Sequence, residues 1–276
     1  MSLELEGAFD LHVHCTPDTR PRKLTARQLA AEAQAAGMGG LLLKNHQIPT
    51  APVAEVLRDE FPGLKLFGGL VLNTAIGGFN AEAVDIAIRM GAKQIWMPTR
   101  SARQECRHLG RADEGLEIHD GGGKLLPSVR DILRLIGEAD VILGTAHLSP
   151  AEIAMLVREG RAMGLRKILI NHPEIEFVHL TVAMQKELSG PGVYFERCFA
   201  RKGFLLDWDG LARSVREVGF ESTALATDLG QPENLSPVDG LAQMRREFAV
   251  RGFSERELRA MLCETPGFLL GVPGAS

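Results

Sequence analysis

Two histidines near the start of the chain have the spacing of a metal-binding motif. Residues 10–14 read Asp10-Leu11-His12-Val13-His14, within a short apolar run that is typical of a β-strand. Side chains alternate along a strand, so Asp10, His12 and His14 share one face. Two imidazoles at this spacing can reach one metal ion at about 2 Å, which suits zinc or a similar ion. The motif therefore predicts the first part of a metal site.

Three more histidines and an aspartate follow other short apolar runs. His46, His147 and His172 come at or just after the ends of such runs, and Asp228 closes another. A single histidine at such a place is more often a hydrogen-bonded loop residue than a ligand, but the repetition favours a shared site. A carboxylate such as Asp228 is costly to bury unless it is paired or metal-bound. It could bind the ion and accept a proton from bound water, with helix capping or a turn as the alternative.

Polar residues beside these histidines are candidates for catalysis and substrate binding. Lys44 lies two residues before His46 on the same strand face, and we predict a catalytic role for it. It is a buried cation, a carbamylated bridging ligand or, alternatively, a lysine that extends to solvent. Asn171, directly before His172, and His46 are predicted to bind substrate, with a loop role as the alternative for Asn171. The direction in which Glu196 faces depends on the strand register.

Short apolar runs alternate with helical patterns along the chain, and these elements must position the residues above. The predicted strands are Ala8–Val13, Gly40–Lys44, Leu64–Leu72, Lys93–Met97, Val141–Ala146, Lys167–Asn171, Val193–Arg197 and Ala224–Thr227. The predicted helices include Thr25–Ala36, Ala81–Met90, Ser128–Glu138, Pro150–Met163 and Pro237–Val250. Eight such units predict an α/β fold, a (β/α)8 TIM barrel, as a single domain over residues 1–276. An open doubly wound sheet is the alternative. In a barrel the carboxyl ends of the strands converge on one mouth, which would bring the histidines together.

Residues 99–126 interrupt the alternation after the fourth predicted strand. The stretch is polar, begins with several arginines and includes three consecutive glycines. A loop this long in a compact domain is usually a lid or a binding segment. Arg100 and Arg103 are therefore predicted to bind substrate, and arginines at such a place suit a carboxylate or phosphate group. A solvated charged loop is the alternative.

Charge and composition exclude several classes of partner. The 276 residues carry a net charge of −4, which argues against nucleic acid. No apolar run approaches the roughly 20 residues that cross a bilayer, and the acidic start does not read as a signal peptide. Four cysteines without a C-x-x-C pair are typical of free thiols in a reducing compartment. We expect a cytoplasmic protein that acts on a small molecule, and the sequence is compatible with a homo-oligomer.

The pattern resembles the amidohydrolase superfamily of metal-dependent TIM-barrel hydrolases over nearly the whole chain. The resemblance rests on His12 and His14 in the first strand, His147 and His172 after the fifth and sixth, and Asp228 after the eighth. It implies that His12, His14 and Asp228 hold one metal ion, with Asp228 as general base. His147 and His172 would hold a second ion or orient the substrate.

The chain departs from that superfamily at the fourth strand. Binuclear members bring a carbamylated lysine or a glutamate from this strand, whereas here it ends Ile95-Trp96-Met97-Pro98-Thr99. The resemblance therefore implies either a single ion or a bridge from another residue such as Lys44. Residues 264–271, by contrast, are similar to the N-P-A-x-L-L-G tail common in the superfamily.

The opening motif also resembles that of the PHP (polymerase and histidinol phosphatase) family, another group of metal-bearing barrels. Residues 44–46, Lys-Asn-His, lie where that family has Thr-Asp-His. The resemblance then weakens, because Asn73 replaces an expected glutamate and residues 228–230 lack the final histidine of D-x-H.

Together these residues predict a hydrolase that cleaves an amide, ester or related carbonyl bond in a small molecule with metal-activated water. Asp228 would take the proton, and Lys44 would stabilise developing negative charge. The expected cofactor is one or two divalent ions, zinc first, with manganese or iron as alternatives. The alternative functions are a PHP-like phosphoesterase, a metal-dependent decarboxylase and a barrel that binds metal without turnover.

Overall fold

Eight parallel strands form a closed barrel in a computed structural model that describes residues 4–111, 114–200 and 202–273. Each strand pairs with the next along the chain: β1 (Phe9–Val13), β2 (Gly40–Leu43), β3 (Lys65–Val71), β4 (Ala92–Trp96), β5 (Ile142–Gly144), β6 (Ile168–Asn171), β7 (Val193–Arg197) and β8 (Thr223–Leu225). The ring closes just beyond β1 and β8, where His14 N donates to Leu229 O and Asp228 N donates to His12 O, both at 2.8 Å. The predicted TIM barrel is confirmed.

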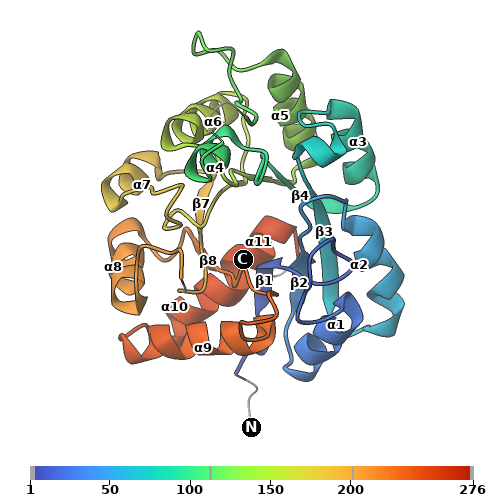
Figure 1. The fold of residues 1–276 in the computed structure, drawn as a ribbon. Helices are drawn as coiled ribbons and strands as arrows, with labels where there is room; N and C mark the ends of the chain where they lie inside the picture. Colours follow the sequence, from blue (N-terminus) through green and yellow to red (C-terminus); the bar gives the residue numbers. More distant parts are fainter. Residues whose placement is uncertain (1–3, 112–113, 201, 274–276) are drawn as a thin grey trace.

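Helices fill the connections and surround the barrel (Figure 1). They are α1 (Ala26–Ala35), α2 (Ala51–Leu57), α3 (Ala81–Arg89), α4 (Arg103–His108), α5 (Pro127–Ala139), α6 (Pro150–Ala162), α7 (Val182–Leu188), α8 (Trp208–Val218), α9 (Pro237–Val250), α10 (Glu255–Arg259) and α11 (Thr265–Leu270), with short turns η1 (Arg58–Glu60), η2 (Thr74–Ile76) and η3 (Ala260–Glu264). The last three elements, α10, η3 and α11, run as one continuous stretch, and α11 contacts β1 and β8. Within the described residues, no helix has the length and apolar character to cross a membrane.

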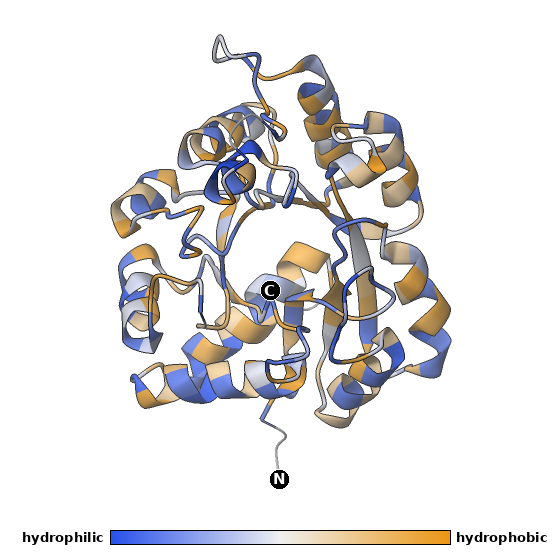
Figure 2. Ribbon diagram, in the orientation of Figure 1, coloured by the Kyte–Doolittle hydropathy of each residue, from blue (hydrophilic) through white to orange (hydrophobic). Residues whose placement is uncertain are grey.

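Apolar side chains fill the layer between strands and helices. Leu41 and Leu43 of β2 pack in a cluster with Leu29 of α1 and Phe248 of α9, whereas Leu42 belongs to another cluster. This alternation follows from the two-residue period of a strand. Figure 2 shows apolar residues along the strands and on the helix faces that meet them. The helices therefore cover the barrel and leave the strand ends to form the site.

The predicted strands all exist, most with ends that differ by one or two residues from the prediction. The connection after β4 differs from the predicted loop, because it contains α4 and is fastened to the barrel. Residues Ala102 and Leu116 form a β-bridge, and Ile118 N donates to Glu152 Oε1 at 3.1 Å. Ile118 is also fully buried. The described part of this connection is a fixed wall of the mouth, and residues 112–113 lie outside the described residues.

Candidate metal centre

His12 presents one lone pair toward the barrel mouth. Its Nδ1 lies 2.8 Å from Glu196 Oε1. An ionised carboxylate only accepts hydrogen bonds, so this contact places the proton of the neutral ring on Nδ1 and leaves a lone pair on Nε2. That Nε2 lies 3.1 Å from Asp228 Oδ1. Two lone pairs that face each other at this distance repel, and a cation between them removes the repulsion.

Three ligand atoms converge at this point. His14 Nε2 lies 3.2 Å from Asp228 Oδ1, and ligand atoms of His12, His14 and Asp228 all lie within 4.8 Å of one another. In a tetrahedral site with bonds of about 2.0–2.1 Å, ligand atoms are separated by about 3.4 Å. The two contacts to Asp228 are close to that edge length. The residues present therefore fit a divalent metal ion, and zinc as its identity stays a prediction.

Lys44 complements the same cluster with a positive charge. Its Nζ lies 3.0 Å from His12 Nε2 and 5.3 Å from the centre of the Trp96 ring. The side chain is buried, and this burial lowers the pKa of its amine. Lys44 projects from the end of β2, on the side of the mouth where β4 brings no carboxylate. The cluster therefore already has one cationic side chain, that of Lys44, in contact with His12 Nε2.

Asp10 lies in the same motif as the histidines, but its carboxylate connects two segments of the barrel. Its carboxylate accepts hydrogen bonds from His12 N and Thr227 N at 3.0 Å and from Thr227 Oγ1 at 2.7 Å. Burial raises the pKa of Asp10 to about 7, although these hydrogen bonds act to lower it. Asp10 therefore ties β1 to the end of β8 and is not a member of the ligand cluster.

Glu196 is held in turn by Asn171. Asn171 Nδ2 donates to Glu196 Oε2 at 3.0 Å, while its Oδ1 accepts from Ala146 N at 2.9 Å. Asn171 is fully buried, so its amide orients Glu196 and does not line the cavity described below. Sequence reasoning left the direction of Glu196 open because one residue of register decides it.

His147, His172 and His46 surround the three convergent residues. The His172 ring centre lies 5.8 Å from that of His12 and 5.0 Å from that of His147, and neither His172 ring nitrogen has a partner among the described residues. His147 Nδ1 bonds to Glu105 Oε2 at 2.5 Å. His46 stacks on His14 at 5.0 Å, and its Nδ1 bonds to Thr99 Oγ1. All five predicted ligands thus lie around the mouth, three of them in the tight cluster.

Three of the buried histidines are held in the neutral form that binds metals. Burial lowers the pKa of His14 to about 3 and holds the pKa values of His46 and His172 well below their usual value. The pKa of His12 is raised instead, because burial and Lys44, which lower it, are outweighed by the carboxylates of Asp228 and Glu196. Neutral imidazoles keep a lone pair for coordination at neutral pH. Two of the positions also have left-handed backbones, with φ of 52° at Asp228 and 29° at His172. Such conformations are uncommon outside glycine and cluster at functional sites.

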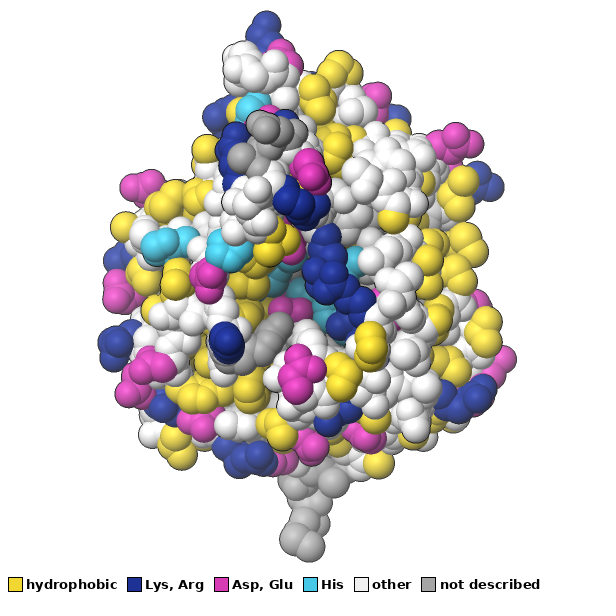
Figure 3. Space-filling model, viewed as in Figure 1, with side chains coloured by type: hydrophobic (Ala, Val, Ile, Leu, Met, Phe, Trp, Pro, Cys, Tyr) yellow, Lys and Arg dark blue, Asp and Glu magenta, His cyan; other side chains and the backbone are white. Residues whose placement is uncertain are grey.

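A cavity of about 470 Å³ opens above the cluster. Figure 3 shows histidine side chains at the floor of this hollow and Lys and Arg side chains beside it. The lining residues are His14, Arg20, Pro21, Arg22, Lys44, His46, Arg100, Glu105, His147, Ile175, Phe177, Asp228, Gln231, Pro232 and Glu233. Arg100 and His46 are among them, and their contact with substrate stays a prediction. Arg103 is not among them, and its Nη2 lies 3.7 Å from Glu117.

Three lining residues, Arg20, Arg22 and Glu105, were not singled out as site residues from the sequence. Arg20 and Arg22 lie in the loop directly after the H-x-H motif, and such loops build the mouth of a TIM barrel. Their place after β1 is a signal that could have found them. Glu105 gives no such signal, because α4 has to fold over the mouth to bring it to His147.

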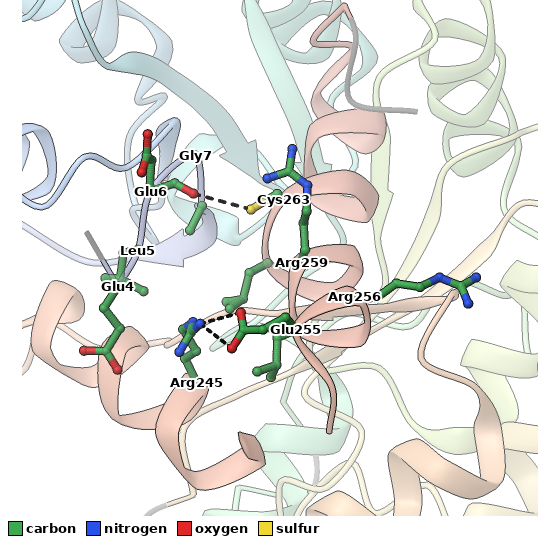
Figure 4. Close-up of a pocket in the computed structure, with 12 residues that line it drawn as sticks. Glu4, Leu5, Glu6, Gly7, Arg245, Glu255, Arg256, Arg259 and Cys263 are labelled. Carbon is green, nitrogen blue, oxygen red and sulfur yellow. Dashed lines mark hydrogen bonds and ion pairs between the residues drawn. The ribbon is translucent and has the colours of Figure 1, made fainter. Parts of the chain in front are cut away.

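A second cavity of about 530 Å³ lies at the opposite end of the barrel, beside residues 4–8 (Figure 4). Two of its charged lining residues, Arg245 and Glu255, pair with each other at 2.6 Å. Cys263 Sγ lies 3.9 Å from Glu6 O. Among the described residues, no cluster of potential metal ligands lines this cavity. The cavity above His14 and Asp228 is therefore the candidate site.

One protein-family model matches most of the chain. The matching family model is described as a family of unknown function, DUF6282, and it covers residues 7–196. That range is more than half of the chain and contains His12, His14, His147 and His172. The chain belongs to the DUF6282 family. No curated protein matches the sequence significantly.

Solved structures resemble the DUF6282 chain in fold over nearly its whole length. An amidohydrolase from Pseudomonas aeruginosa aligns with a TM-score of 0.67 at 11% identity, covering 97% of both chains. The probable dipeptidase PvdM from the same organism aligns with a TM-score of 0.65 at 11% identity over 97% of this chain and 95% of that one. A 2,6-dihydroxybenzoate decarboxylase from Rhizobium gives 0.63 at 10% identity over 98% and 100%. At these identities the shared property is the barrel fold.

Proposed function

We propose that this DUF6282 protein is a metal-dependent hydrolase of the amidohydrolase type that acts on a small molecule. It would cleave an amide, ester or related carbonyl bond with one divalent ion, zinc first, bound by His12, His14 and Asp228. One observation carries the proposal: His12 Nε2 faces Asp228 Oδ1 at 3.1 Å, with His14 Nε2 at 3.2 Å from the same oxygen. Nitrogen-rich sites of this size suit zinc better than magnesium or calcium.

A divalent ion at this place lowers the pKa of water to about 7 and polarises a carbonyl group. Asp228 accepts the proton of the attacking water, since its carboxylate is at the cavity surface next to both histidines. The Lys44 side chain, whose Nζ lies 3.0 Å from His12 Nε2, would stabilise negative charge on the substrate. His147, fixed by Glu105, orients the substrate from the other side of the mouth.

Two sets of possible ligand atoms converge, His12 with His14 and Asp228, and His12 with Glu196 and Cys198. The proposal places one ion at the first set, because His14 and Asp228 line the cavity and Glu196 and Cys198 do not. At the end of β4, Thr99 Oγ1 bonds to His46 and to Asn73, so its side chain is engaged within the protein. Asn73, at the position where the PHP comparison expects a glutamate, also donates to His46 O. The carbamylated form of Lys44 and the PHP resemblance stay predictions.

The experiment is a metal-dependent assay with a matched pair of variants. Metal-free protein is reloaded with one equivalent of zinc and tested on N-acyl amino acids, dipeptides, lactones and aryl esters. We expect zinc-dependent hydrolysis, and Asp228→Asn should lower kcat/KM by about 10²–10⁴-fold because the base and a ligand are lost together. Asp131→Asn, an exposed change on α5, should keep full activity.

Other outcomes assign the site differently. Full activity of Asp228→Asn, or turnover that does not depend on metal, contradicts the proposed mechanism. Release of CO₂ from aromatic acids would favour the decarboxylase alternative, and hydrolysis of an aryl phosphate would favour the phosphoesterase. Stoichiometric zinc binding without any turnover would favour the alternative of a barrel that binds metal but does not catalyse a reaction.

A further inference from the structure

Three arginines line one side of the cavity above the metal cluster. Arg20 and Arg22 come from the loop after β1, and Arg100 comes from the connection after β4. The Arg22 side chain is only 5% exposed, and that of Arg100 is 35% exposed. These guanidinium groups are therefore part of the cavity wall, and Figure 3 shows basic side chains gathered beside the hollow.

The loop that carries Arg20 and Arg22 is held in place on both sides. Asp18 Oδ1 accepts from Arg20 N at 3.0 Å, which closes a tight turn. Lys23 N donates to Gly230 O at 2.8 Å, which ties the loop to the segment after β8. Asn45 Nδ2 donates to Pro17 O at 2.9 Å from the end of β2. These three hydrogen bonds hold the loop at the mouth of the barrel and so determine where Arg20 and Arg22 lie.

Positive charge exceeds negative charge on this wall. Asp18 Oδ2 accepts from Arg22 Nε at 2.8 Å and pairs with Arg22 Nη2 at 2.7 Å, so Arg22 has one carboxylate partner. Arg100 Nη1 has only a long contact of 4.0 Å to Glu105, which also serves His147. No ion pair involves the Arg20 side chain within the described residues. Burial lowers the pKa of Arg100, and the charges of Arg20 and Arg22 add to this effect.

A wall of like charges in a partly desolvated cavity is stabilised by an anion. Guanidinium groups bind carboxylate and phosphate oxygens through paired hydrogen bonds, and they do so best where water is partly excluded. Asp228, the carboxylate on the floor, belongs to the metal cluster, and Glu105 is bonded to His147. Glu233 also lines the cavity but forms no ion pair with the three arginines within the described residues. An anionic group of a ligand would therefore complete the wall.

We propose that Arg22 and Arg100, with Arg20 at the rim, form an oxyanion subsite that binds a carboxylate or phosphate group of the substrate at a distance from the bond that is cleaved. The inference rests on the proposed function and names its substrate class. Ile175 and Phe177 line the same cavity and offer it an apolar surface. The substrate is thus a small anionic molecule whose reactive carbonyl group lies over His14 and Asp228 and whose anionic end lies on the arginines.

The cavity volume agrees with a ligand of this size. About 470 Å³ is within the range of roughly 300–1,000 Å³ that is typical of small-molecule sites. Binding energy at the anionic end orients the reactive bond over the metal ligands, so the subsite contributes to turnover as well as to affinity. A neutral analogue of the same length loses this orientation.

The test measures binding, not turnover, with glutarate, inorganic phosphate and the neutral diamide glutaramide as probes. Isothermal titration is done on the full chain, once loaded with zinc and once metal-free. We expect glutarate or phosphate to bind, glutaramide to bind at least about tenfold more weakly, and added salt to weaken the anion. Preference for glutarate over phosphate assigns a carboxylate substrate, and the reverse preference assigns a phosphate.

Variants locate the subsite. Arg22→Met and Arg100→Met should each raise the dissociation constant of the preferred anion about tenfold or more, in both metal states. Arg107→Met is the matched control, because Arg107 lies on α4 close to Arg100 in sequence but faces Glu117 at 3.6 Å and does not line the cavity. Circular dichroism checks the fold. Should Arg22→Met not fold after its loss of Asp18 pairing, Arg100→Met alone decides.

Two results would overturn the inference. One is equal affinity of Arg100→Met and the parent protein for both anions, and the other is equal affinity of glutarate and glutaramide for the parent protein. The metal-free arm separates this inference from the proposed hydrolase function. A protein that binds no zinc and hydrolyses nothing can still show anion binding that depends on Arg100, and an active zinc enzyme can lack it.

Discussion

His12 is the residue at which most contacts of the site meet. Glu196 accepts a hydrogen bond from Nδ1 at 2.8 Å, while Nε2 faces Asp228 and Lys44. The backbone of His12 is fixed as well, since its N donates to Asp10 and its O accepts from Asp228 N. An imidazole held at one nitrogen presents its other lone pair in a single direction, and this orientation supports tight metal binding.

Loss of the Glu196 carboxylate should weaken metal binding without unfolding the barrel. In Glu196→Gln the amide can donate to Nδ1 of His12, which would shift the ring proton to Nε2 and block the lone pair. We expect zinc affinity to fall by about 10–100-fold, measured by competition with a chromophoric chelator. Glu187→Gln, an exposed change on α7, should leave the affinity unchanged. Equal zinc affinity of Glu196→Gln and the parent protein would remove Glu196 from the metal site.

At the scale of elements, the connection after β4 determines the shape of the mouth. Its short helix α4 brings Glu105 to His147, which follows β5. The first turn of α6 holds this connection in return: Glu152 Oε1 accepts from Ile118 N, and Glu152 Oε2 accepts from Ser149 N and Oγ. One glutamate therefore both caps a helix and anchors the wall.

Glu152→Ala should remove both functions of the first turn of α6, the cap and the anchor. We expect the free energy of unfolding to fall by about 1–3 kcal/mol, from the lost cap and the unpaired Ile118 N, in urea titrations. Trypsin should also cut the 99–126 connection faster under native conditions. Glu257→Ala removes the corresponding capping box of α10, far along the chain from this connection, and should lower stability with no change in cleavage there. Equal protection of the connection in all three proteins would show that Glu152 does not anchor it.

At the scale of the whole molecule, the proposed metal ligands come from the ends of the first and the last strand. His12 and His14 belong to the end of β1, and Asp228 follows β8, so the three side chains meet only when the barrel closes. The same junction carries the hydrogen bonds from Asp228 N and His14 N that complete the ring. An ion at this place therefore joins the two ends of the sheet, and its binding adds to the stability of the closed barrel.

The sequence predicts the barrel and the ligand cluster because both depend on local patterns. Apolar runs alternate with helices, and His12, His14 and Asp228 stand at run ends that the topology brings together. Side chains on the connections follow no such rule. Arg100 and Arg103 are three residues apart, yet Arg100 lines the cavity and Arg103 lies near Glu117.

Burial and tertiary contacts decide the remaining site residues. The Asn171 side chain bonds to Glu196 and does not face the cavity, because a buried amide and a buried carboxylate each need a hydrogen-bond partner. Arg22 reaches the cavity through its pairing with Asp18, a contact between two loop residues that no periodicity marks. Packing and hydrogen bonding, which appear only in three dimensions, therefore supply what the sequence pattern leaves open.

The most direct test of the metal centre is a crystal of zinc-loaded protein measured on both sides of the zinc absorption edge. We predict one anomalous peak at about 2.0–2.2 Å from His12 Nε2, His14 Nε2 and an Asp228 oxygen. The Lys44 ammonium should no longer bond to His12 Nε2. A fully occupied peak elsewhere in the chain, or none beside these three side chains at saturating zinc, would contradict the account.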